Sequence, residues 1–222
     1  MKQSLTMQAA VKILAGAALV ALLLFLPAGT LAWRGAWLFL ALLFVPIAVV
    51  GVVLLRKNPE LLEKRLNGKE KAAQQRGVVG LSGLMFLAGF VLAGLDARFG
   101  WTCVPLWLTV AAVLFLMAYV LYAEVLRENA YLSRTIEVQK GQTVVDTGLY
   151  GVVRHPMYAA TVLLFLAMPL VLGSWVSFAV FLVYPALMVV RIRHEEALLT
   201  KELAGYDAYI QKVRWRMIPF IW

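Results

Sequence analysis

Charged residues are scarce in this chain. They make up 15% of its 222 residues, whereas soluble domains of this size carry about 25%. Apolar residues make up 63%, and the mean hydropathy is +0.82. This composition excludes an ordinary water-soluble domain.

Residues that hold metals or form disulfides are also few. The single cysteine, Cys103, excludes an internal disulfide framework and a cysteine metal cluster. Two histidines, His155 and His194, do not make a metal centre by themselves, and we predict no metal site. The sequence has no Walker phosphate loop, no GxSxG and no HExxH. Its one GLYG stretch, at 148–151, lacks the strand–turn–helix context of a dinucleotide site.

What the sequence has instead is long apolar blocks. They cover residues 13–33, 35–55, 78–95, 101–123, 157–172 and 174–190. A helix needs roughly 20 apolar residues to cross a membrane, so the first four blocks suffice and the last two are short. The first is read as a retained helix and not a signal peptide, because more spans follow it. We therefore predict an all-α integral membrane protein with about six transmembrane helices.

The basic residues lie mainly on one side of the predicted membrane. With the N-terminus in the cytoplasm, loops 56–77 and 127–154 and the stretch 191–216 lie inside, and only Arg34 and Arg98 lie outside. This asymmetry follows the positive-inside rule. The net charge of +9 is therefore explained by topology, and we expect no nucleic-acid partner. Both termini are predicted to be cytoplasmic, most simply in a bacterial inner membrane.

Three stretches on that side are candidates for further structure. Asn58 and Pro59 suit the cap and first turn of a short helix lying on the headgroups, although a solvated connector fits as well. The loop 127–154 is long enough to suggest a function, and 135–145 alternates enough to allow extended structure. The last span is expected to continue as a charged helix over 191–211. We divide the chain into an N-terminal membrane region, 1–126, and a cofactor-binding region, 127–222.

The densest group of reactive side chains is Arg154-His155-Pro156-Met157-Tyr158. Pro156 suits the first position of a helix and restricts His155 to extended geometry. The free N–H groups of such a helix start can bind an anion. The same pattern alone is also typical of an ordinary membrane-helix start.

A second group, Arg191 with Glu195 and Glu196, follows the last apolar block. Arg191 and Glu195 share a helix face. An ordinary surface ion pair is one interpretation, but carboxylates at the membrane boundary are costly without partners. Because blocks 157–172 and 174–190 form a helical hairpin, their cytoplasmic ends should meet. We therefore expect 154–158 and 191–196 to be neighbours.

These residues resemble a known family, the isoprenylcysteine carboxyl methyltransferases in their bacterial branch, which share their plan with phospholipid methyltransferases. The resemblance is carried in chain order by Thr147-Gly148-Leu149-Tyr150, Arg154-His155-Pro156-Met157-Tyr158, Arg191, Glu195-Glu196, Gly205-Tyr206, Tyr209 and Ile218-Pro219. It implies methyl transfer from S-adenosylmethionine to a lipophilic acceptor that enters from the bilayer.

By this resemblance, the cofactor pocket would be lined by Gln139, Gln142, Thr143, Val144, Val145, Tyr150, His155, Pro156, Met157, Tyr158 and Glu195. The family often has histidine at the position of Gln142. Arg191, Glu196 and Arg154 are the predicted catalytic residues. A carboxylate acceptor would need Arg191 for orientation, whereas a thiol or amine would need a base, for which Glu196 or His155 could serve.

Two alternatives remain open from the sequence. An NAD(P)H-dependent membrane reductase of the sterol or enone type carries a similar Arg-His-Pro stretch, but an acidic residue usually follows it, where this chain has Ala159-Ala160-Thr161. A transporter would place ionisable residues mid-span or show repeated halves, and this chain has neither. An inert scaffold would tolerate Arg191→Ala or Glu195→Ala without loss of cofactor affinity, and we expect both substitutions to weaken it. The acceptor itself is open: a prenylcysteine-like carboxylate, an isoprenoid and a membrane lipid all fit.

Overall fold

The computed structural model describes residues 2–66, 73–102, 108–132 and 137–222. Cys103 lies outside the described residues. Within them every regular element is helical: α1 Lys2–Ala28, α2 Arg34–Lys57, α3 Pro59–Leu66, α4 Ala73–Phe99, α5 Leu108–Glu128, the 3₁₀ turn η1 Gly148–Gly151, α6 Pro156–Val171, α7 Trp175–Phe181, α8 Val183–Glu202 and α9 Tyr206–Lys212. The predicted all-α class is therefore confirmed.

Five helical stretches in the described part of the chain are long and apolar enough to cross a membrane. They are Ser4–Ala28, Arg34–Lys57, Gln75–Phe99, Val110–Glu128 and Trp175–Glu202. The fifth predicted span, 157–172, corresponds to α6, which is apolar but shorter. The stretch through α7 and α8 continues beyond the last apolar block into charged sequence, as predicted, and ends at Glu202. The protein is thus a helical membrane protein in which α6 is an apolar helix shorter than the five candidate spans.

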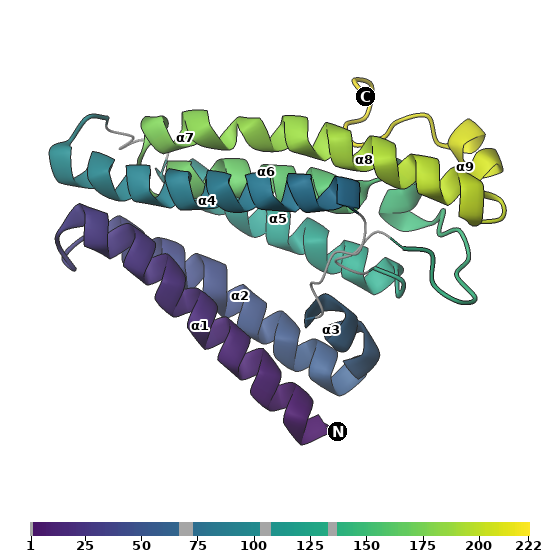
Figure 1. The fold of residues 1–222 in the computed structure, drawn as a ribbon, viewed down its shortest axis with the longest axis horizontal. Coiled ribbons are helices and arrows are strands. Elements are labelled where there is room, and N and C mark those ends of the chain that lie inside the picture. The colour runs from purple at the N-terminus through teal and green to yellow at the C-terminus, as the bar shows by residue number, and fades with distance from the viewer. Residues whose placement is uncertain (1, 67–72, 103–107, 133–136) are drawn as a thin grey trace.

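The helices run alternately between the two ends of the bundle (Figure 1). The helix α3, the turn η1 and the helix α9 all lie at one end, which we call the pocket end. The loops predicted to lie on one side of the membrane, 56–77 and 127–154, therefore do converge in their described parts.

An aromatic cluster holds the middle of the bundle together. The Phe39 ring from α2 lies 6.0 Å from that of Phe115 in α5, and Phe86 from α4 lies 5.4 Å from Phe181 in α7. Gly89 permits the close approach of α4 and α7, since a side chain there would collide with the Phe181 ring. The buried cluster takes residues from both sides of position 126, so the division at 126/127 stays a prediction and does not separate two cores.

The short helix predicted from Asn58 and Pro59 in loop 56–77 is present as α3. The Leu61 amide donates to Oδ1 of Asn58 at 3.1 Å, which is the N-cap bond expected there. The inner side chains Leu61 and Leu62 are buried. The packed helix, and not the solvated connector, is therefore correct.

One local prediction was wrong. The charged helix does not continue over 191–211: α8 ends at Glu202, and Gly205 adopts a left-handed conformation (φ 85°) before α9 begins. Glycine reaches such angles easily, so the chain turns there. The stretch 135–145 contains no strand in its described part, 137–145; it forms a turn in which the Gln142 amide donates to the Gln139 carbonyl at 3.0 Å.

Candidate functional site

The start of α6 and the middle of α8 meet through the phenol of Tyr158. This hydroxyl donates to Oε2 of Glu195 at 2.5 Å and accepts from Nε of Arg191 at 2.9 Å. Tyr158 and Arg191 are both more than nine-tenths buried. The predicted proximity of 154–158 and 191–196 is confirmed, and Tyr158 links the two groups.

Glu196, the next residue of α8, is the centre of a separate cluster formed with Arg154, His155 and Arg216. Its Oε1 accepts from Arg154 Nε at 2.7 Å and lies 3.2 Å from His155 Nε2, while its Oε2 accepts from Arg216 Nε at 2.7 Å. A carboxylate saturated in this way is held in its ionised form, because each partner favours the charge.

The C-terminal segment, residues 213–222, is held by the same cluster. Arg154 Nη1 donates to the carbonyls of Val213 and Arg214 at 2.6 and 2.9 Å. The backbone amides of Arg154 and His155 donate to the carbonyls of Trp215 and Arg216. Since the His155 amide is used in this way, and the Tyr158 amide donates to the His155 carbonyl at 3.1 Å, the start of α6 resembles an ordinary helix start more than an open anion site.

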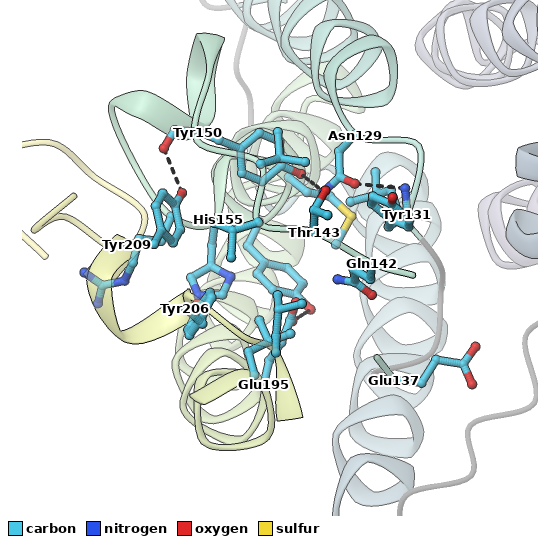
Figure 2. A pocket seen from close by; sticks show the side chains of 18 of the residues that line it. Asn129, Tyr131, Glu137, Gln142, Thr143, Tyr150, His155, Glu195, Tyr206 and Tyr209 are labelled. Carbon is cyan, nitrogen blue, oxygen red and sulfur yellow. Dashed lines mark hydrogen bonds between the residues drawn. The ribbon is translucent and has the colours of Figure 1, made fainter. Parts of the chain in front are cut away.

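The loop before α6 supplies the opposite wall. Asn129 Nδ2 donates to the Tyr150 hydroxyl at 3.0 Å, and the Tyr209 hydroxyl donates to the Tyr150 carbonyl at 2.7 Å. Burial raises the pKa of Tyr150 to about 12, so its phenol stays neutral at physiological pH. These bonds attach η1 to α5 on one side and to α9 on the other (Figure 2).

A pocket lies between these walls at the pocket end of the bundle. It encloses about 820 Å³, including its mouth open to solvent. Figure 2 shows Thr143 and Gln142 on the loop side, and Glu195 and Tyr206 from the C-terminal helices on the other. It is lined by Asn129, Tyr131, Leu132, Glu137, Gln142, Thr143, Val144, Val145, Tyr150, Arg154, His155, Met157, Tyr158, Arg191, Glu195, Leu199, Leu203, Tyr206 and Tyr209.

Most of the residues predicted to bind the cofactor line this pocket, together with Arg154 and Arg191. Three predicted site residues do not line it. Gln139 is turned to Lys64, whose Nζ donates to its Oε1 at 2.6 Å, and to the carbonyl of Tyr131. Pro156 occupies the first position of α6, and Glu196 faces Arg154, His155 and Arg216.

Several lining residues were missed from the sequence, and Tyr206 is the clearest. It is 4% exposed, and its hydroxyl has no hydrogen-bond partner among the described residues. In the sequence, Leu198, Leu199, Leu203, Tyr206 and Ile210 recur at helical spacing, which is typical of an apolar packing stripe. This pattern concealed a pocket-facing phenol at the break between α8 and α9. Burial and the nearby carboxylates Glu196 and Glu195 raise the pKa of Tyr206, so the hydroxyl remains a donor.

A second, largely apolar cavity adjoins the first. It encloses about 1070 Å³, its opening included, and is lined by Arg65, Val78, Val79, Ser82, Gly83, Phe86, Tyr122, Met157, Tyr158, Thr161, Phe165, Tyr184, Met188 and Arg191. Met157, Tyr158 and Arg191 line both spaces. We call the first space the polar pocket and the second the apolar cavity.

Fold and site together define a helical membrane protein with a polar pocket and an apolar cavity that share one wall. Residues 106–204 match the family model described as phospholipid methyltransferase, which confirms the resemblance for this segment and covers the Tyr158–Arg191–Glu195 group. The chain is also 34% identical over 94 residues to the uncharacterized protein YpbQ of Bacillus subtilis (strain 168). That alignment covers 42% of this chain and 56% of the relative, so the chain matches about half of the relative's length. The comparisons give no support to the reductase alternative.

Proposed function

We propose that this protein transfers a methyl group from S-adenosylmethionine to a lipophilic acceptor. The polar pocket would hold the cofactor, and the apolar cavity would hold the acceptor. The observation that carries the proposal is the shared wall: Met157, Tyr158 and Arg191 line both spaces. A methyl donor that enters the polar pocket from water and a lipid that enters the apolar cavity from the bilayer would therefore be separated by only these three side chains.

The residues of the polar pocket fit S-adenosylmethionine. The Tyr206 hydroxyl is buried and unpartnered among the described residues, which is costly unless a ligand accepts its hydrogen bond. Glu195 places a carboxylate on the wall, suited to a ligand with positive charge. The rings of Tyr150, Tyr158 and Tyr206 suit both a flat base and a cation. Gln142 adds an amide at the position where the family often has histidine.

When bound, the cofactor supplies a methyl group on a positively charged sulfur, which makes that carbon a strong electrophile. The protein's task is then to align the acceptor and to exclude water. Tyr158 is 5% exposed and Arg191 is 9% exposed, so water has little access to the shared wall. Arg191 and Glu195 fix the orientation of the Tyr158 phenol from its two sides.

The arrangement argues against Glu196 as a general base. Its two oxygens accept from Arg154 and Arg216 and contact His155, and it does not line the polar pocket. We therefore assign Glu196 and Arg154 to positioning: they hold 154–155 and the C-terminal segment in place. Arg191 keeps its predicted role of facing the acceptor, because it lines the apolar cavity.

The membrane orientation belongs to the same proposal. Loops 56–77 and 127–154 and the stretch 191–216 hold most of the basic residues, and their described parts lie towards the pocket end. The positive-inside rule favours the cytoplasm for this end, which is where S-adenosylmethionine is made available to enzymes. Both termini would then be cytoplasmic.

Retention of the cofactor tests this function most simply. The detergent-purified full chain is equilibrated with labelled S-adenosylmethionine or with labelled NADPH, and bound label is measured after rapid filtration. We expect saturable retention of S-adenosylmethionine and none of NADPH. Retention of NADPH but not of S-adenosylmethionine would overturn the proposal.

A further inference from the structure

Gln75 is a buried polar residue that lines neither the polar pocket nor the apolar cavity. It lies in the first turn of α4 and is 2% exposed. Its Oε1 accepts a hydrogen bond from Nη1 of Arg191 at 3.5 Å. A residue far from the cofactor-binding segment in sequence therefore touches the guanidinium that lines both the polar pocket and the apolar cavity.

The orientation of the Gln75 amide follows from its partner. A guanidinium can only donate hydrogen bonds, so the oxygen of the amide must face Arg191 and the nitrogen must face elsewhere. That nitrogen, Nε2, is buried and has no partner among the described residues. A buried amide with one satisfied end and one unsatisfied end is costly for a fold that gains nothing from it. The cost is removed when a ligand oxygen accepts from Nε2.

Gln75 does not itself line the apolar cavity, but it lies on the same face of α4 as three residues that do. Val78, Val79 and Ser82 follow it at spacings of three, four and seven, and all three line that cavity. Residues at these spacings share one face of an α-helix. Gln75 therefore precedes the lining residues of α4 by one turn, at the level where Arg191 enters from α8.

The charges around the apolar cavity have one sign. Arg65 and Arg191 line it, and none of its lining residues in the described part of the chain is acidic. Glu195, the nearest carboxylate along α8, accepts from Tyr158 and lines the polar pocket instead. Both guanidinium groups would repel a cationic amine head. A head that offers oxygen acceptors could accept a hydrogen bond from either guanidinium group.

We propose that Gln75 is a specificity-determining residue for the methyl acceptor. Its Nε2 donates a hydrogen bond to an oxygen of the acceptor's polar head, beside Arg191, and the pair selects carboxylate or carbonyl heads over amines. This inference rests on the proposed function only in naming the ligand of the apolar cavity as the methyl acceptor. Gln75 itself is assigned no part in the transfer of the methyl group.

The test measures binding of two matched amphiphiles to the full chain in detergent: hexadecanoate and hexadecylamine, which differ only in the head. Their dissociation constants are determined for the wild-type protein and for Gln75→Leu and Gln75→Glu. We expect the wild-type protein to prefer hexadecanoate. Gln75→Leu should weaken hexadecanoate binding by ~10-fold, as expected for a lost hydrogen bond to a charged group, and leave hexadecylamine unchanged. Gln75→Glu should weaken it further by repulsion.

The thermal unfolding temperature of each variant in detergent serves as the measure of folding, and retention of S-adenosylmethionine is measured separately. A wild-type protein without head preference, or a Gln75→Leu variant that retains both S-adenosylmethionine and the full preference, would overturn the inference. Loss of S-adenosylmethionine binding in Gln75→Leu alone would also overturn it, because Gln75 would then act on the polar pocket. A wild-type protein that prefers hexadecanoate but does not bind S-adenosylmethionine would contradict the proposed function and leave the assignment of Gln75 intact.

Discussion

The Nε of Arg154 lies 2.7 Å from Oε1 of Glu196, and both side chains are more than nine-tenths buried. The pair joins the start of α6 to α8, across the hairpin formed by α6, α7 and α8. Arg154 also holds the backbone of Val213 and Arg214. One ion pair therefore fixes three segments, and the walls of the polar pocket depend on it.

Removing the charge of Glu196 should lower the stability of the protein, because the ion pair has a structural role. Glu196→Gln leaves Arg154 buried without its counter-charge, and breaking a buried pair costs on the order of 3 kcal/mol. We expect a clear fall in the thermal unfolding temperature in detergent. Glu202→Gln, an exposed change on the same helix, should leave that temperature unchanged. Full thermal stability together with abolished methyl transfer would instead indicate that Glu196 acts as a base.

Removing the Tyr206 hydroxyl should weaken cofactor binding without lowering the stability of the protein. Because the hydroxyl has no partner among the described residues, Tyr206→Phe should leave the stability of the ligand-free protein equal or higher and weaken S-adenosylmethionine binding by ~5- to 10-fold. Tyr209→Phe removes a hydroxyl that donates to the Tyr150 carbonyl, so it should lower stability. Equal cofactor affinities in Tyr206→Phe and wild type would contradict the assignment.

The contribution of the Tyr206 hydroxyl to cofactor affinity should not depend on pH in the physiological range. Burial raises the pKa of Tyr206, so its phenol remains protonated at least to its ordinary value of about 10. The ratio of wild-type to Tyr206→Phe affinity should therefore stay constant between about pH 6.5 and 9. The dissociation constants of both proteins across that range provide the check. A ratio that approaches one as the pH rises would show that the phenol ionises.

Filling the apolar cavity should block the acceptor and spare the cofactor. Gly83 lines that cavity, and a side chain added there meets no atom within 4 Å. Gly83→Leu should raise the KM for the lipid acceptor and leave the S-adenosylmethionine dissociation constant unchanged. Gly80→Leu is the matched control: it also has open space, but it does not line the cavity. Equal acceptor KM values for the two variants would contradict the assignment of the cavity.

The first position of η1, Gly148, should tolerate no side chain. Gly148 has φ 52°, and a Cβ there would lie 2.6 Å from the Glu128 carboxyl carbon. Gly141 also has a positive φ, 74°, but faces open space. Gly141→Ala should cost about 1–2 kcal/mol for the left-handed backbone alone, and Gly148→Ala should cost more, because Glu128 must move. The free energies of unfolding of the two variants are compared by thermal unfolding. Equal decreases would show that the Glu128 side chain moves away without cost.

Much of this arrangement could be read from the sequence because it depends on local pattern. Pro156 marks the start of α6 by its fixed φ, and the short apolar blocks predicted a hairpin that brings Tyr158 to Arg191 and Glu195. Asn58 and Pro59 predicted α3. The charge asymmetry predicted that the loops of the pocket end lie together.

The rest depends on contacts between distant segments. Gln75 could not be recognised as part of the site, because only the packing of α4 against α8 brings it to Arg191. Tyr206 belongs to an apolar stripe in the sequence, and it faces the pocket only because the chain turns at Gly205. Gln139 was predicted to bind the cofactor from the resemblance, yet the turn at 139–142 points its side chain to Lys64. Their roles, like those of the other site residues, stay proposals.

Transfer of a labelled methyl group tests the central claim most directly. The purified full chain is incubated with S-adenosylmethionine labelled in its methyl group and with a membrane lipid extract, and the organic phase is separated and its labelled product identified. The account predicts label in a lipophilic product, diminished in Gly83→Leu and retained in Gly80→Leu. Absence of labelled product from a protein that is folded and supplied with the full extract would contradict it.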